Sequence, residues 1–149
     1  MNSQIPEARD AVFIVDDDEA VRDSVQVLLA ARGFDALAFD SAAAILASLE
    51  TRRPVCLIVD LHMPAINGIE LLKTLIVRGI RLPAVMITGR IDRTSRRWAQ
   101  EAGAAIVLEK PFTDDELFEA IRAARLVAEA GAEAAIRRIP NCPFPMASR

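Results

Sequence analysis

Residues 55–60 read VCLIVD, an uninterrupted apolar run that ends in the carboxylate of Asp60. A strand that is apolar on both faces is typical of a parallel sheet covered by helices on both sides. Residues 11–15, AVFIV, form a second run of this kind and lead directly into Asp16-Asp17-Asp18. Together the two runs predict a buried parallel sheet.

Outward from these runs, short apolar segments alternate with longer amphipathic ones. Strands are expected at residues 11–15, 34–39, 55–59, 83–87 and 104–108. The segments between them, and the one after the last, carry apolar residues at helical spacing. Five strand–helix units joined by right-handed crossovers predict a flavodoxin-like α/β fold, a doubly wound (βα)5 sheet with strand order 2-1-3-4-5.

Helix starts are marked by capping residues. Asp18 and Ser41 are expected N-caps of the helices that follow the first two strands. Thr113 and Glu116 have the spacing of a capping box at the start of the last helix. These signals agree with the boundaries that the apolar pattern predicts.

Length and composition exclude several classes of protein. The chain has 149 residues, with 18 basic and 21 acidic side chains, so a nonspecific nucleic-acid binder with a basic excess is not expected. Cys56 and Cys142 fit neither a metal knuckle nor a disulfide framework. No apolar run approaches the ~20 residues that a bilayer requires, and residues 1–10 lack a signal-peptide stretch, so a cytoplasmic location is expected.

The ends of the expected strands carry the residues capable of chemistry. Asp16 and Asp17 follow the first strand, Asp60 the third, Thr88 the fourth and Lys110 the fifth. The carboxyl ends of parallel strands meet at one edge of the sheet, so these groups should gather there. Clustered carboxylates repel one another, and Mg²⁺, which prefers oxygen ligands, would relieve that repulsion.

This edge is suited to phosphoryl transfer. A mononucleotide or flavin phosphate site would instead need Gly, Ser and backbone N–H groups after the first strand. Asp60 is central in strand order and placed to attack a phosphorus atom, while Thr88 and Lys110 could hold the transferred oxygens. Each residue alone is more often a helix cap or a solvated side chain, so the prediction depends on their joint occurrence.

Five short motifs follow one another along the chain: Val15-Asp16-Asp17-Asp18, Val59-Asp60-Leu61-His62-Met63-Pro64, Asn67-Gly68, Ile87-Thr88-Gly89 and Glu109-Lys110-Pro111-Phe112. With these motifs the sequence resembles the receiver domains of bacterial response regulators over about residues 12–126. Among them it looks most like receivers of transcriptional regulators with helix-turn-helix outputs. The resemblance implies a phosphorylation switch rather than an enzyme, with a sensor histidine kinase or phosphotransfer protein as phosphoryl donor.

The resemblance also implies a metal site. Asp60 would be the phosphoacceptor, and Asp17 and Asp60 would bind Mg²⁺ directly together with the backbone carbonyl of His62. Asp16 would act mainly through water. In the family, the positions of His62 and Arg90 vary and tune dephosphorylation.

For the switch, the resemblance implies that Thr88 moves to the phosphoryl group and that Lys110, before a cis Pro111, pairs with it. Val107 stands where the family usually has an aromatic residue, so a switch without a ring swing is expected. The face that changes would be built by the fourth helix, the fifth strand and the fifth helix, and a homodimer through it is allowed. No direct contact with nucleic acid or membrane is expected.

The domain boundaries follow from the fading of the apolar pattern beyond about Leu126. An N-terminal extension is expected at residues 1–10, a receiver domain at 11–127, and a helical extension with a proline-rich tail at 128–149. The segment after Leu126 is too short for an output domain.

Two alternatives stay open from the sequence. One is a small Mg²⁺-dependent phosphohydrolase with an Asp nucleophile, in which only His62 could serve as the general acid. Turnover of a phosphate ester would identify it. The other is a transcription factor whose DNA-binding part lies outside this chain, which the length of the natural reading frame would decide.

Overall fold

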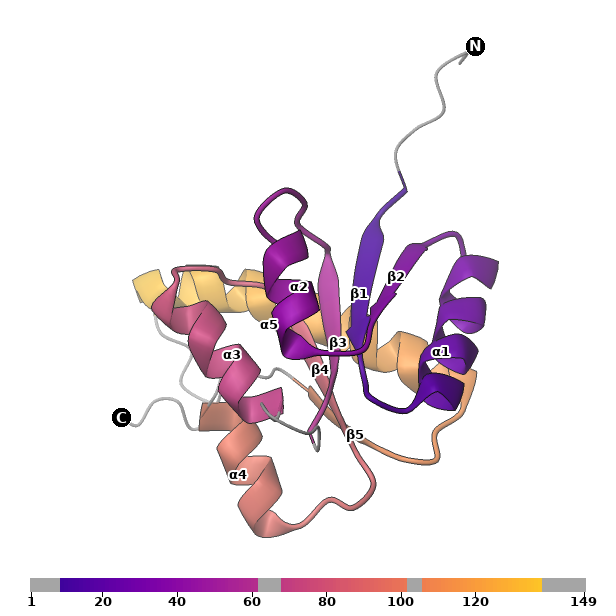
Figure 1. Ribbon diagram of the computed structural model, residues 1–149. Helices are drawn as coiled ribbons and strands as arrows, with labels where there is room; N and C mark the ends of the chain where they lie inside the picture. The colour runs from indigo at the N-terminus through magenta and orange to yellow at the C-terminus, as the bar shows by residue number, and fades with distance from the viewer. Residues whose placement is uncertain (1–8, 62–67, 102–105, 138–149) are drawn as a thin grey trace.

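The computed structural model describes residues 9–61, 68–101 and 106–137 (Figure 1). One parallel sheet runs in the order β2-β1-β3-β4-β5, as predicted. Its strands are β1 (Ala11–Val15), β2 (Asp35–Phe39), β3 (Cys56–Asp60), β4 (Ala84–Thr88) and β5 (Ile106–Glu109). The helices are α1 (Glu19–Ala31), α2 (Ala42–Ser48), α3 (Gly68–Val77), α4 (Arg93–Glu101) and α5 (Asp114–Arg137). The flavodoxin-like fold is confirmed.

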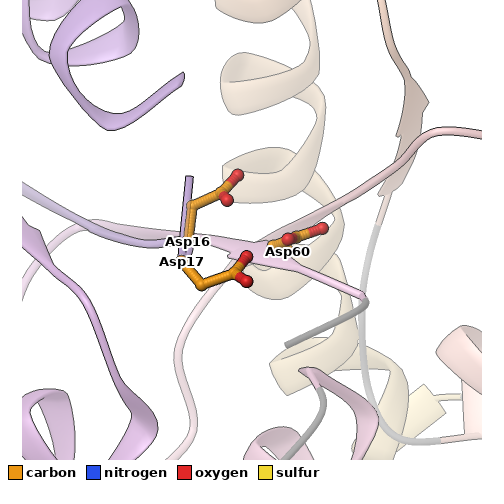
Figure 2. A group of neighbouring side chains, drawn as sticks. All are labelled: Asp16, Asp17 and Asp60. Carbon is orange, nitrogen blue, oxygen red and sulfur yellow. The ribbon is translucent and has the colours of Figure 1, made fainter. Parts of the chain in front are cut away.

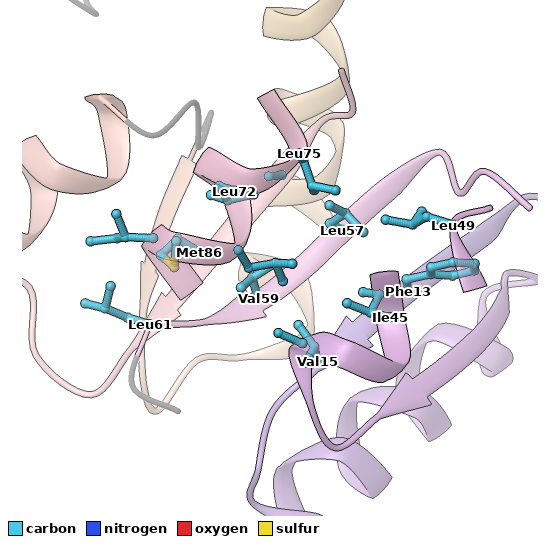
Figure 3. Close-up of a cluster of buried hydrophobic side chains, with 14 of the residues drawn as sticks. Phe13, Val15, Ile45, Leu49, Leu57, Val59, Leu61, Leu72, Leu75 and Met86 are labelled. Atoms are coloured by element: carbon cyan, nitrogen blue, oxygen red, sulfur yellow. The ribbon is translucent and has the colours of Figure 1, made fainter. Parts of the chain in front are cut away.

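The central strands β1, β3 and β4 are buried because helices cover both faces of the sheet, whereas the edge strands β2 and β5 are only partly buried. Figure 1 shows α2 and α3 in front of the sheet and α5 behind it. Alternate strand side chains point to opposite faces, which divides the core into two clusters. In the first, shown in Figure 3, side chains such as Phe13, Leu57 and Met86 pack against α2, α3 and α4. In the second, Ile14 and Ile58 pack with their neighbours against α1 and α5.

The predicted helix caps are confirmed. The carboxylate of Asp18 accepts a hydrogen bond from the backbone N–H of Ala20 at 2.9 Å, and Ser41 caps α2 in the same way. At α5 the capping box is reciprocal. The N–H of Thr113 donates to Glu116 Oε1 at 2.8 Å, and the N–H of Glu116 donates to Thr113 Oγ1 at 3.1 Å.

Strand register brings the predicted residues to one edge. Val15 lies opposite Val59, so β1 and β3 end at nearly the same level. Asp60 in turn lies opposite Ile87, one residue before Thr88. Side chains at or just after these positions therefore emerge together at the carboxyl edge of the sheet.

The helix α5 spans 24 residues and continues to Arg137, past the predicted domain boundary at residue 127. That boundary stays a prediction, and the proline-rich segment at 138–149 lies outside the described residues.

Charged side chains recur along α5. Neither α5 nor another helix among the described residues is long and apolar enough to cross a membrane.

Candidate functional site

Three carboxylates meet at the carboxyl edge of the sheet. Asp16 and Asp17 directly follow β1, and Asp60 is the last residue of β3. Oxygens of the three side chains lie within 4.8 Å of one another, and Figure 2 shows the three residues close together at the end of the strands. Asp16 and Asp60 are buried, with 1% and 5% of their surface exposed, whereas Asp17 is exposed.

Lys110 brings a positive charge to the two buried carboxylates. Its Nζ lies 3.4 Å from Asp16 Oδ2 and 3.8 Å from Asp60 Oδ1. The residue follows β5, and its backbone N–H donates to the carbonyl of Thr88 at 2.8 Å. Buried charges are costly unless paired, and this ammonium supplies the paired positive charge. The peptide between Lys110 and Pro111 is cis, as the resemblance implied.

The donor set of this pocket fits Mg²⁺. Its carboxylate oxygens are hard ligands of the kind that Mg²⁺ prefers. Asp16 already accepts a hydrogen bond from the N–H of Asp18 at 2.9 Å and faces Lys110 with its other oxygen. Asp17 and Asp60 are therefore better placed for direct ligation. His62, whose carbonyl was the fourth predicted ligand, lies outside the described residues.

Thr88 is fully buried at the end of β4, beside the strand that carries Asp60. Its hydroxyl donates to the backbone oxygen of Arg90 at 3.1 Å. The backbone N–H of Arg90 donates to the same hydroxyl at 3.2 Å. In this conformation the hydroxyl is held by its own loop.

Gly68 supports the end of β3, a role that was not predicted from the sequence. A Cβ at this position would clash with the backbone oxygen of Asp60 and would lie 2.9 Å from Val59 Cγ1 and 3.0 Å from Met86 Sδ. The N–H of Gly68 donates to the carbonyl of Leu61 at 3.1 Å. In the sequence, Asn67-Gly68 was one motif of the resemblance and gave no sign of this contact, whereas in the structure the glycine allows α3 to approach β3.

Arg22 is a second residue that the sequence gave no reason to select. It lies in α1, half-buried, and its Nη1 donates to the backbone oxygen of Asp16 at 2.7 Å. An arginine on an amphipathic helix is usually solvated, so its pattern carries no signal of this contact.

Cys56 belongs to the core and not to the site. Burial raises the pKa of its thiol from 9.0 to about 12, so the group is protonated at neutral pH. A neutral buried thiol is a poor nucleophile. Cys142 lies outside the described residues.

Residues 12–122 match the family model described as a response regulator receiver domain. The chain is 38% identical over 122 residues to the transcriptional regulatory protein FixJ of Bradyrhizobium diazoefficiens, covering 82% of this chain and 60% of the relative. It is 42% identical over 113 residues to FixJ of Rhizobium meliloti, covering 76% and 55%. The chain thus spans little more than half the length of these curated relatives.

Solved structures show the same similarity. Full-length FixJ from B. japonicum aligns with a TM-score of 0.76 and 37% identity, covering 86% of this chain and 63% of that one. The structure described as FixJ-N aligns with a TM-score of 0.74 and 39% identity, covering 80% and 96%. The aligned region therefore includes almost the whole of the FixJ-N structure.

Proposed function

The chain belongs to the family of response regulator receiver domains, and from that premise we propose that it accepts a phosphoryl group on Asp60. Receivers of this family act in two-component systems. The observation that supports the proposal most directly is the cluster of three carboxylates at the end of the central strand, two of which, Asp16 and Asp60, are paired with the ammonium of Lys110. The proposed donor is a phosphohistidine on a sensor kinase or phosphotransfer protein.

In the proposed reaction, a carboxylate oxygen of Asp60 attacks phosphorus. The new P–O bond forms as the P–N bond to the donor imidazole breaks, and the leaving nitrogen keeps the electron pair and takes a proton from solvent. Lys110, already 3.8 Å from Asp60, is placed to pair with the transferred oxygens. Bound Mg²⁺ would neutralise charge on those oxygens as they pass between the two groups.

We propose that the switch begins at Thr88. To reach the phosphoryl oxygens its hydroxyl must exchange its hydrogen bonds with the backbone of Arg90. That exchange would free the connection between β4 and α4 and alter the face made by α4, β5 and α5. Val107 of β5 is half-buried in the cluster that includes Ala99 of α4, so no aromatic ring is available there to swing. The same face is the proposed surface for a homodimer.

The test is intact-mass analysis after treatment with acetyl phosphate and Mg²⁺. Wild type should gain the mass of one phosphoryl group, Asp60→Asn none, and the exposed-site control Asp115→Asn should behave as wild type. Equal uptake by Asp60→Asn would refute the proposal.

We propose that the chain is not a phosphohydrolase. A receiver catalyses only its own phosphorylation and slow dephosphorylation, whereas an enzyme would release phosphate continuously. Incubation with p-nitrophenyl phosphate and Mg²⁺ distinguishes the two. Sustained release that Asp60→Asn abolishes would favour the enzyme instead.

A further inference from the structure

The loop between β1 and α1, residues 16–18, is closed by Arg22. The guanidinium Nη1 donates to the backbone oxygen of Asp16 at 2.7 Å, and the N–H of Arg22 donates to the backbone oxygen of Asp18 at 3.0 Å. The backbone bond is the first bond of α1 and does not depend on the side chain, whereas the guanidinium holds the start of the loop that carries two of the three carboxylates.

The oxygen bound by the guanidinium belongs to the peptide unit that joins Asp16 to Asp17. Because a peptide unit is planar, fixing its oxygen restricts the ψ torsion of Asp16 and the φ torsion of Asp17 together. These torsions set the directions in which both carboxylates leave the backbone. Asp17 is exposed, so packing does little to orient it and the backbone is its main constraint.

We propose that Arg22 is a positioning residue for the metal site: by holding the Asp16 carbonyl it keeps the carboxylates of Asp16 and Asp17 directed at Asp60. The proposal rests on the function proposed above and adds to it a residue that touches neither the metal nor the phosphoryl group. Partners that orient metal ligands from outside the ligand shell commonly affect metal affinity strongly.

Charge and geometry predict opposite effects when Arg22 is removed. A guanidinium near the pocket repels a cation, so the loss of its charge alone would tighten Mg²⁺ binding. The loss of its hydrogen bond would loosen the ligands and weaken binding. The direction of the change in the dissociation constant therefore separates positioning from simple electrostatics.

The chain offers a matched control for stability. Gln26, one turn further along α1, donates from Nε2 to the backbone oxygen of Ala36 at 2.9 Å. This is also a side chain of α1 bound to a backbone carbonyl, but the carbonyl belongs to β2 and not to the acidic loop, residues 16–18. Gln26→Met therefore reports what such a contact contributes to the fold alone.

The experiment measures Mg²⁺ affinity by isothermal titration calorimetry for wild type, Arg22→Met, Arg22→Lys and Gln26→Met. Arg22→Met should weaken the affinity about tenfold, the lower range for loss of an orienting partner. Gln26→Met should leave it unchanged. Arg22→Lys keeps a charge and a donor but not the planar fork, so its Mg²⁺ affinity should lie between those of Arg22→Met and Gln26→Met. At saturating Mg²⁺, phosphorylation of Arg22→Met should approach the wild-type rate.

The inference is overturned if Arg22→Met binds Mg²⁺ as tightly as Gln26→Met, or more tightly. Should Arg22→Met fail to fold, the same comparison is made with Arg22→Lys. A wild type that binds no Mg²⁺ would refute the proposed function itself, so the two failures are distinguishable.

Discussion

The two sides of the candidate site differ in the contacts that fix their residues in place. On the side of β1 and β3, the acidic loop is braced by Arg22, and Gly68 lets α3 pack against the backbone of Asp60. On the side of β4, the hydroxyl of Thr88 bonds only to the neighbouring backbone of Arg90 in the described structure. We call these the acidic side and the switch side.

Few of the described side chains anchor α4, the helix that follows the switch side. Among the described side chains of α4, only Ala99 is buried. Its first turn carries Arg93 and no acidic residue, although cations are unfavourable at a helix N-terminus. Phosphoryl transfer requires fixed geometry, and a switch requires an element that can move at low cost. The acidic side meets the first requirement and the switch side the second.

The largest expected effect is that of a methyl group at Gly68. Gly68→Ala should lower the free energy of unfolding by about 3 kcal/mol, the upper range for overpacking, because the added Cβ meets backbone that cannot yield. The acceptor carboxylate should be displaced as well, so phosphorylation by acetyl phosphate should slow. Urea unfolding and intact mass measure the two effects.

The matched variant is Gly89→Ala on the switch side, where a Cβ would meet nothing within 4 Å. It should leave the free energy of unfolding nearly unchanged. Equal losses of unfolding free energy in Gly68→Ala and Gly89→Ala would mean that the acidic side and the switch side are packed equally tightly.

Mg²⁺ should stabilise the fold through the acidic side. Binding to the folded state alone raises the free energy of unfolding by about 2.7 kcal/mol at a hundredfold excess over the dissociation constant. Melting curves in Mg²⁺ or EDTA measure the shift, and Asp17→Ala should abolish it. An unchanged shift in that variant would place the metal elsewhere.

A smaller effect is expected from the movement of the switch side. Trp98 is the only tryptophan of the chain and lies in α4, so its fluorescence can report a change in that helix. Mg²⁺ with beryllofluoride, a phosphoryl mimic, should alter the emission of wild type but not of Thr88→Ala. An equal response in both proteins would show that another residue couples the site to α4.

The smallest effect tests the anchoring of α4. Arg93→Glu replaces an unfavourable charge at the helix N-terminus by a favourable one and should raise the free energy of unfolding by about 0.5–1 kcal/mol. Arg93→Gln should give roughly half of that gain. Urea unfolding at low ionic strength measures both, and a loss of stability in either would show that Arg93 has a stabilising partner.

The sequence predicted the fold and the location of the site for a simple reason. Each strand is a short apolar run, and charged residues follow Val15 and Val59. The side chains capable of chemistry therefore lie where the strands end. In a parallel sheet those ends share one edge, which places Asp16, Asp17 and Asp60 together without knowledge of the packing. The caps at Asp18 and Thr113 were predictable because their partners lie within three residues.

What could not be predicted depends on contacts across the fold. The close approach of Gly68 to Asp60 is set by the way α3 packs on β3. Whether the guanidinium of Arg22 reaches the backbone oxygen of Asp16 depends on the rotamer of the arginine side chain. The sequence also gave no reason to expect the burial of Ala99 in α4, which is complete. Such a small residue contributes little to an apolar pattern.

The contact between Lys110 and Asp16 also bears on how the protein is made. The two residues are separated by 94 positions, so this ion pair is among the last that a chain growing from its N-terminus can form. Long-range contacts of this kind are slow to form because the intervening loop must first be closed. Until β5 joins the sheet, Asp16 and Asp60 face each other without their ammonium. Competence for phosphorylation should therefore appear only once the last strand has docked, which makes it a marker of completed folding.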